Sequence, residues 1–259
     1  YQGDPLSVYQ LLCHDKENNL LLESAEIDQK HLLKSLLLTD AALKIVCNGA
    51  NVTFTALTPN GQAALHFAAT QIQAHATLTL SNNDSVLTAN FPEVPAELDE
   101  KSRLMAINPF EGLRLFQRIN NSNDHHFAVF LGGVFAFDMI GTSEQLPDVP
   151  DGDNTCPDFV YYLAETLVVI DHEEQSSQVI ANVFSTAHND SSDSINENNI
   201  HAQLAARVSD IKQLLSKQIT SEQVADLIAV NTKQVNSSNT SAQQTVSVDV
   251  SDAQFCQHV

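Results

Sequence analysis

The spacing of hydrophobic residues near the start of the chain is typical of a short helix. Asp4-Pro5 reads as an N-cap followed by proline at the first helical position. Leu6, Tyr9 and Leu12 follow at helical spacing. The pattern predicts an amphipathic helix that ends near Lys16.

A run of apolar residues and a stretch of alternation follow, and both indicate strands. Leu20-Leu21-Leu22 stops abruptly at Glu23-Ser24, which predicts a buried strand whose end opens into a loop. Hydrophobic residues then alternate over 42–47 and 52–57, and the Asn48-Gly49 pair between them favours the positive φ angles of a tight turn. The sequence therefore predicts a β-hairpin there.

The middle of the chain combines one further helix signal with long β-prone runs. Asn108-Pro109 predicts the start of a helix that ends near residue 120. Residues 127–140 and 159–170 are rich in aromatic and β-branched side chains and predict core strands, and a turn over 171–177 leads to an antiparallel strand at 179–184. Hairpins with occasional helices and no regular βαβ rhythm favour an α+β fold built on antiparallel sheets.

The last third of the chain is polar. Residues 186–199 and 231–244 are rich in Ser, Asn and Asp and predict mobile segments on either side of a helix at about 201–216. Alternation resumes at Val246, Val248 and Val250. We therefore expect a folded domain over 1–185, a polar linker with one helix over 186–244, and the opening of another domain over 245–259.

Charge and composition exclude several classes of function. The 259 residues hold 12 Lys and Arg against 32 Asp and Glu, a net charge of −20 that repels nucleic acid and anionic lipid. Without an apolar stretch of membrane-spanning length, a signal peptide or a CxxC pair, the sequence predicts a cytoplasmic protein in a reducing compartment, with no nucleic-acid or membrane partner.

Few residues suggest chemistry by themselves. His125-His126 and Asp171-His172-Glu173-Glu174 lack metal-ligand spacing and are interpreted as solvated hairpin residues, so no metal site is expected. Gly132-Gly133 indicates a close-packed or bulged strand, and we find no catalytic constellation. Glu23-Ser24 has two interpretations: a polar cap at the strand end, or a carboxylate and a hydroxyl that contact a small ligand.

Longer segments give the chain a family resemblance. LLLESAEIDQKHLLKSLLLTDAALKI (20–45), FPEVPAELDEKSRL (91–104), GGVFAFDMI (132–140) and CPDFVYYLAETLVVIDH (156–172) resemble the N-terminal region of anthranilate synthase component I. The resemblance implies an α+β fold with sandwich-like antiparallel sheets and helices packed outside. It also implies that the LLES segment lines an allosteric tryptophan site, which assigns tryptophan binding to Leu22, Glu23, Ser24 and Lys34. Lys34 could instead only support the loop.

The same resemblance implies what lies outside this chain. In that family a C-terminal domain holds the chorismate pocket, the Mg²⁺ carboxylates and the acid/base groups, so we expect no catalytic residue, no bound cofactor and no activity in this chain alone. The full-length subunit would form anthranilate and pyruvate from chorismate and ammonia, which a glutamine amidotransferase subunit (component II) supplies. Two alternatives stay open: an aminodeoxychorismate synthase-type relative with a structural tryptophan, and a truncated binding or interaction module without catalysis.

Overall fold

The computed structural model describes residues 1, 3–23, 34–81, 83–95, 97–119, 121, 123–137, 139, 156–184 and 193–217. The chain divides into two compact units, Tyr1–Ile219 and Thr220–Val259. All described residues belong to the first unit. The predicted domain opening at 245–259 and most of the predicted linker at 186–244 therefore lie outside the described residues.

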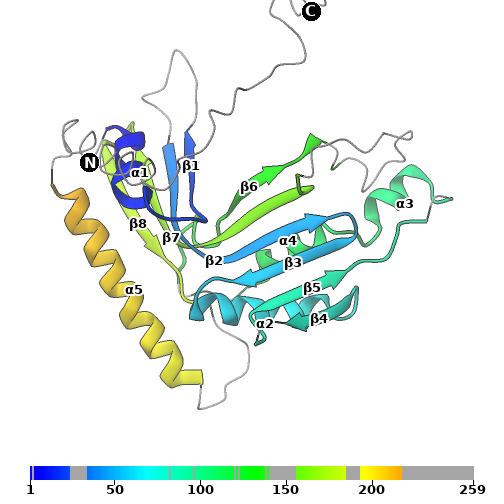
Figure 1. The fold of residues 1–259 in the computed structure, drawn as a ribbon. Coiled ribbons are helices and arrows are strands. Elements are labelled where there is room, and N and C mark those ends of the chain that lie inside the picture. Colours follow the sequence, from blue (N-terminus) through cyan, green and yellow to red (C-terminus); the bar gives the residue numbers. More distant parts are fainter. Residues whose placement is uncertain are drawn as a thin grey trace, which may run out of the picture. The chain divides into compact units, whose positions relative to one another are not determined.

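One antiparallel sheet of eight strands forms the centre of the first unit (Figure 1). Its strands are β1 (Leu20–Glu23), β2 (Lys34–Asn48), β3 (Asn51–Ala56), β4 (Thr77–Ser81), β5 (Val86–Asn90), β6 (Leu131–Phe135), β7 (Phe159–Asp171) and β8 (Ser176–Ala181). The main path runs β4-β5-β3-β2-β7-β6, while β1 pairs with β2 and β8 pairs with β7.

The two long strands, β2 and β7, divide the sheet into two halves. Their pairing shifts register between Leu38 and Leu43, and β-bulges of this kind bend a strand pair. On one side of the bend β3, β5, β4 and β6 extend the pair to form the wide half of the sheet. On the other side β1 and β8 flank it to form the narrow half.

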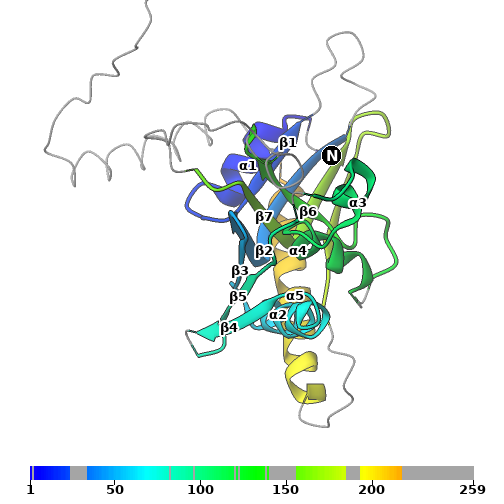
Figure 2. The same cartoon turned by 90° about the vertical axis from the view of Figure 1, so that its right-hand side faces the viewer.

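Helices pack against both halves (Figures 1 and 2). The helices in the described ranges are α1 (Pro5–Cys13), α2 (Pro59–Ile72), α3 (Glu100–Met105), α4 (Glu111–Arg114) with the 3₁₀ helix η2 (Leu115–Arg118), and α5 (Asp193–Leu215); α3 has no buried residue. Helix α2 packs on β2, β3 and β5 of the wide half, and α1 packs on β1 and β2 of the narrow half. None of the helices in the described ranges is both long enough and apolar enough to cross a membrane.

The hydrophobic core differs between the halves. The wide half shares one large cluster with α2 and η2, in which Phe54, Phe116 and Phe159 are completely buried. The narrow half has a smaller cluster on each face. One contains Leu37 and residues of α1 and α5, and the other centres on Leu38.

Several sequence predictions are confirmed. The architecture is α+β with antiparallel pairing, although the strands form one bent sheet because β2 and β7 belong to both halves. Asp4 caps α1 by accepting a hydrogen bond from the Ser7 amide. The hairpin at 42–57 is present, but Gly49 alone has a positive φ (57°) in that turn, and Asn48 belongs to the strand.

Several boundaries were wrong. Helix α1 ends at Cys13 and not near Lys16, and the strand predicted at 179–184 is Ser176–Ala181. Asn108 accepts a hydrogen bond from the Phe110 amide and closes a turn, so the helix begins only at Glu111. Among the described residues of the strand predicted at 127–140, the paired strand is Leu131–Phe135. Helix α5 begins at Asp193 rather than near residue 201. Ile200 and Leu204 pack on Val183, and this apolar contact stabilises the helix within the stretch 186–199 that was predicted to be mobile.

The double glycine in β6 has the steric role that the sequence suggests. A Cβ on Gly133 would lie 2.1 Å from the carbonyl oxygen of Val160, and one on Gly132 would lie 2.6 Å from Leu20 Cδ2. The close approach of β6 to β7 therefore requires glycine at position 133.

Candidate functional site

The predicted ligand residues lie where β1 ends and β2 begins, at one end of the narrow half. Antiparallel pairing puts Leu22 opposite Leu36 and Glu23 opposite Ser35. Lys34 is the first residue of β2. Ser24 lies outside the described residues. The register therefore places three of the four predicted residues at one end of the same strand pair.

The alternation of the strands separates these residues by face. Leu22, Leu36 and Lys34 point to one face of the sheet, because residues directly opposite, or two apart in one strand, share a face. Glu23 and Ser35 point to the other face, which α1 covers. Leu22 is 40% exposed, so part of its apolar side chain faces solvent.

The β7–β8 turn supplies a partner for Lys34. Asp171, the last residue of β7, pairs with Lys34 in the register, and its Oδ2 lies 3.0 Å from the Lys34 Nζ. Asp171 Oδ1 accepts hydrogen bonds from the backbone amides of Glu173 and Glu174, at 3.1 and 3.0 Å. The pKa of Asp171 is lowered, chiefly by the hydrogen bond from the Glu174 backbone amide and next by the hydrogen bond from the Lys34 ammonium.

A second contact ties β2 to the same turn on the other face. Ser35 is only 1% exposed, and its hydroxyl forms a hydrogen bond with His172 Nε2 at 2.9 Å. His172 Nδ1 in turn hydrogen-bonds the Tyr1 hydroxyl at 3.0 Å, and the two rings meet edge to face. The first two residues of β2 therefore contact two consecutive residues, Asp171 at the end of β7 and His172 in the turn that follows it.

Sequence reasoning missed the part that this turn plays. It treated Asp171-His172-Glu173-Glu174 as solvated charges, whereas Asp171 and His172 contact Lys34 and Ser35. The strand pairing of β2 with β7 creates both contacts, and the distance in sequence between these residues hides them. Local hydrophobic spacing contains no signal for that pairing.

The strand end combines an apolar side chain with charges of both signs. Leu22 offers apolar contact surface, Glu23 offers negative charge, and Lys34 offers positive charge. Within the described ranges, no group of three or more His, Cys, Asp and Glu side chains is arranged to hold a metal. The rings of His125 and His126 stack on each other, with centroids 4.3 Å apart.

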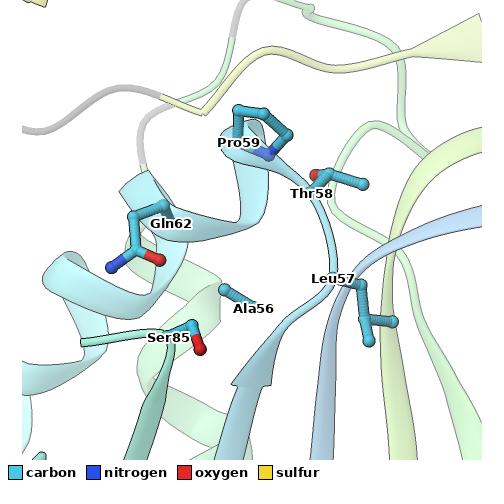
Figure 3. Close-up of a pocket in the computed structure, with 6 residues that line it drawn as sticks. All are labelled: Ala56, Leu57, Thr58, Pro59, Gln62 and Ser85. Carbon is cyan, nitrogen blue, oxygen red and sulfur yellow. The ribbon is translucent and has the colours of Figure 1, made fainter. Parts of the chain in front are cut away.

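An open pocket of about 370 Å³ lies elsewhere, where β3 leads into α2 (Figure 3). Its lining residues are Ala56, Leu57, Thr58, Pro59, Gln62 and Ser85. None of them carries a charge. The Thr58 hydroxyl caps α2 by accepting from the Gly61 amide and donates to Glu165 Oε1, so its hydrogen bonds serve the fold.

Comparisons with known proteins bear directly on the family. No protein-family model matches the chain. Anthranilate synthase component 1 of Vibrio cholerae is 38% identical over 99% of this chain and 44% of its own length. The Escherichia coli protein of the same name is 38% identical over 84% of this chain and 39% of its own length. The Vibrio parahaemolyticus protein of that name is 42% identical over 71% of this chain and 34% of its own length.

One solved structure is also similar. Anthranilate synthase component I from Streptococcus pneumoniae TIGR4 matches 78% of this chain and 34% of that chain, at 16% identity and a TM-score of 0.34, and a score this low adds nothing to the fold described above. The chain spans less than half the length of the curated relatives it matches. Identities of 38% over almost the whole chain nevertheless confirm the sequence resemblance: the chain is a homologue of part of anthranilate synthase component I.

Proposed function

We propose that this chain is the N-terminal, regulatory portion of anthranilate synthase component I and contributes to a site for L-tryptophan at the ends of β1 and β2. The observation that carries the proposal is the combination found there. Leu22 is 40% exposed and shares a face with the Lys34 ammonium, while the Glu23 carboxylate belongs to the opposite face at the end of the same strand pair.

Each part of tryptophan has a candidate contact in this proposal. Glu23 is the counter-charge for the ligand ammonium, and Leu22 is apolar surface for the indole ring. Ser24, which follows Glu23, adds a hydroxyl, and Lys34 is the counter-charge for the ligand carboxylate. Glu23 and Lys34 belong to opposite faces, so the ligand backbone would lie beyond the strand ends, where side chains from both faces can reach it.

The activity that we propose belongs to the longer protein. There, chorismate and ammonia from a glutamine amidotransferase subunit would yield anthranilate and pyruvate in the cytoplasm. The Mg²⁺ ligands and the acid/base groups would belong to the portion outside this chain, so the chain alone would be inactive. Tryptophan would inhibit by binding more tightly to a state with a disfavoured active site.

The two alternatives make different predictions. In an aminodeoxychorismate synthase-type relative, tryptophan would be structural, so it would neither exchange nor inhibit turnover. A truncated binding module would bind a ligand or the amidotransferase without any catalytic half. The similarity of this chain to proteins named anthranilate synthase component 1 favours neither alternative.

Isothermal titration with L-tryptophan tests the proposal, on this chain and on the protein extended by the remaining length of its relatives. Micromolar binding, about 8 kcal/mol, by both proteins would mean that the strand end forms a nearly complete site. Binding by the extended protein alone would mean that the site is shared between the two portions. The absence of binding by both would contradict the proposal.

Substitution of Ser24 by Phe is expected to desensitise the extended enzyme, because the larger ring would fill the space for the ligand. The measurement is the tryptophan concentration that halves the activity, which should rise at least tenfold while uninhibited turnover is retained. Ser81→Phe is the matched control, because Ser81 ends the exposed strand β4 of the wide half. If tryptophan inhibits the Ser24→Phe enzyme as strongly as it inhibits the wild type, the site is misplaced.

A further inference from the structure

The Lys34 ammonium, which the proposed site needs, is already paired within the protein. Its Nζ lies 3.0 Å from Asp171 Oδ2, and the two side chains are 47% and 10% exposed. A carboxylate ligand would have to replace Asp171 or share the ammonium with it. We infer that Asp171 competes with the carboxylate of a bound amino acid for Lys34, and so lowers the affinity of the strand-end site; this inference rests on the proposed function.

The two oxygens of Asp171 make separate contacts, so its competition can be removed without disturbing the turn. Oδ1 accepts the amides of Glu173 and Glu174, and these bonds close the β7–β8 turn. Oδ2 contacts Lys34. Asparagine keeps an acceptor oxygen for the two amides and loses the negative charge. Asp171→Asn therefore isolates the competing charge.

The acidic residues around Lys34 also disfavour the binding of a carboxylate there. A hydrogen bond to Asp171 is the largest cause of the raised pKa of Lys34, and Glu173 and Glu174 contribute further. Lys34 thus stays charged at neutral pH and lies in a negative environment. That environment disfavours an incoming carboxylate, and Asp171 is the member of it in direct contact with the ammonium.

The expected size of the effect follows from the exposure of Lys34. Ion pairs that face solvent are weak and are screened by salt. We therefore expect Asp171→Asn to bind L-tryptophan about two- to fivefold more tightly than the wild type at low salt. The gain should shrink at high salt, and a structural effect of the substitution would not shrink in this way.

The test compares L-tryptophan with tryptamine, which has the same ring and ammonium but no carboxylate. Titration calorimetry of wild type and Asp171→Asn at about 50 mM and about 500 mM NaCl should show a gain for L-tryptophan only, and chiefly at the lower salt. The experiment uses this chain, or the extended protein if that alone binds. An equal gain for both ligands, or no gain for L-tryptophan, would overturn the inference.

Two further variants keep the result interpretable. Glu174→Gln removes a charge from the same turn without touching the ammonium, and should change the affinity less than Asp171→Asn. In a Lys34→Gln background, Asp171→Asn should have no further effect, which a double-mutant cycle detects even if one variant is less stable. If neither this chain nor the extended protein binds tryptophan, the proposed function fails and the inference falls with it. Binding without the Asp171 effect overturns the inference alone.

Discussion

The wide half of the sheet buries one continuous apolar cluster against α2 and η2, whereas the narrow half has a smaller cluster on each face and charged residues at its end. The ion pair between Glu111 and Arg114 of α4, on the wide half, joins neighbours on one helix and not two strands. In the narrow half, Lys34 and Asp171 pair near a half-exposed Leu22. The comparison indicates that apolar burial is concentrated in the wide half, and that the narrow half is where we propose the ligand site.

The bend between the halves holds two carboxylates in opposite circumstances. Asp40 in β2 accepts contacts from Lys16 Nζ at 2.5 Å and Arg207 Nε at 3.0 Å. Burial acts to raise its pKa, but the hydrogen bonds from these two cations bring that pKa below its ordinary value. Glu165 in β7 instead has a neutral partner, the Thr58 hydroxyl, and burial raises its pKa.

The largest loss of stability is expected from truncation in the wide half. Phe54 is completely buried against Phe116, and Phe54→Ala should lower the free energy of unfolding by about 3–5 kcal/mol, since it removes apolar contact and leaves a cavity. Denaturant titration measures this. The matched control is Phe137→Ala, because Phe137 is 95% exposed and should change stability by no more than about 0.5 kcal/mol. Similar losses at both positions would refute the asymmetry between core and surface.

A smaller loss is expected at the bend, where charge rather than apolar contact holds the elements together. Asp40→Asn leaves Lys16 and Arg207 without their carboxylate, and should cost about 1–2 kcal/mol. Because Arg207 belongs to α5, the substitution should increase the rate of amide hydrogen exchange more in α5 than in α2. Asp84→Asn is the control, since Asp84 lies in a turn with φ 62°, a conformation that Asn tolerates. An unchanged exchange rate in α5 would show that its apolar contacts suffice.

The sequence predicts the elements whose signals are local. Asp4-Pro5, Asn48-Gly49 and the β-prone run of β7 each lie within a few residues of the structure that they form. Helix α2 escaped notice although Thr58-Pro59 has the same cap-and-proline form as Asp4-Pro5, and the β4–β5 hairpin was missed too. Apolar residues alone do not decide whether such stretches become helix or strand; packing on β2 and β3 does.

The candidate site was predictable only in part, for the same reason. Leu22, Glu23 and Lys34 were assigned through resemblance, and the structure places them at one strand end. Asp171 and His172 come to that end through the pairing of β2 with β7, over more than a hundred residues. The bulges that bend those strands leave Glu165 unpaired in the register, and no local pattern indicates which residue is skipped.

The smallest effect is expected at that skipped residue. Glu165 is 8% exposed, and its pKa is raised chiefly by burial, so the folded state binds its proton more tightly than the unfolded state does. Its contribution to folding is thus most favourable at acid pH, and declines as pH rises from the unfolded pKa of about 4.3 through the raised folded value.

Glu165→Gln cannot ionise, and its amide oxygen can still accept from Thr58. The variant should therefore gain thermal stability relative to wild type as pH rises from about 4 to 7, and the gain should level off above the folded pKa. Thermal melts across this range measure the difference, with the exposed Glu93→Gln as control. A difference that is the same at every pH would mean that folding does not shift the pKa of Glu165, and would refute the contrast between Glu165 and Asp40.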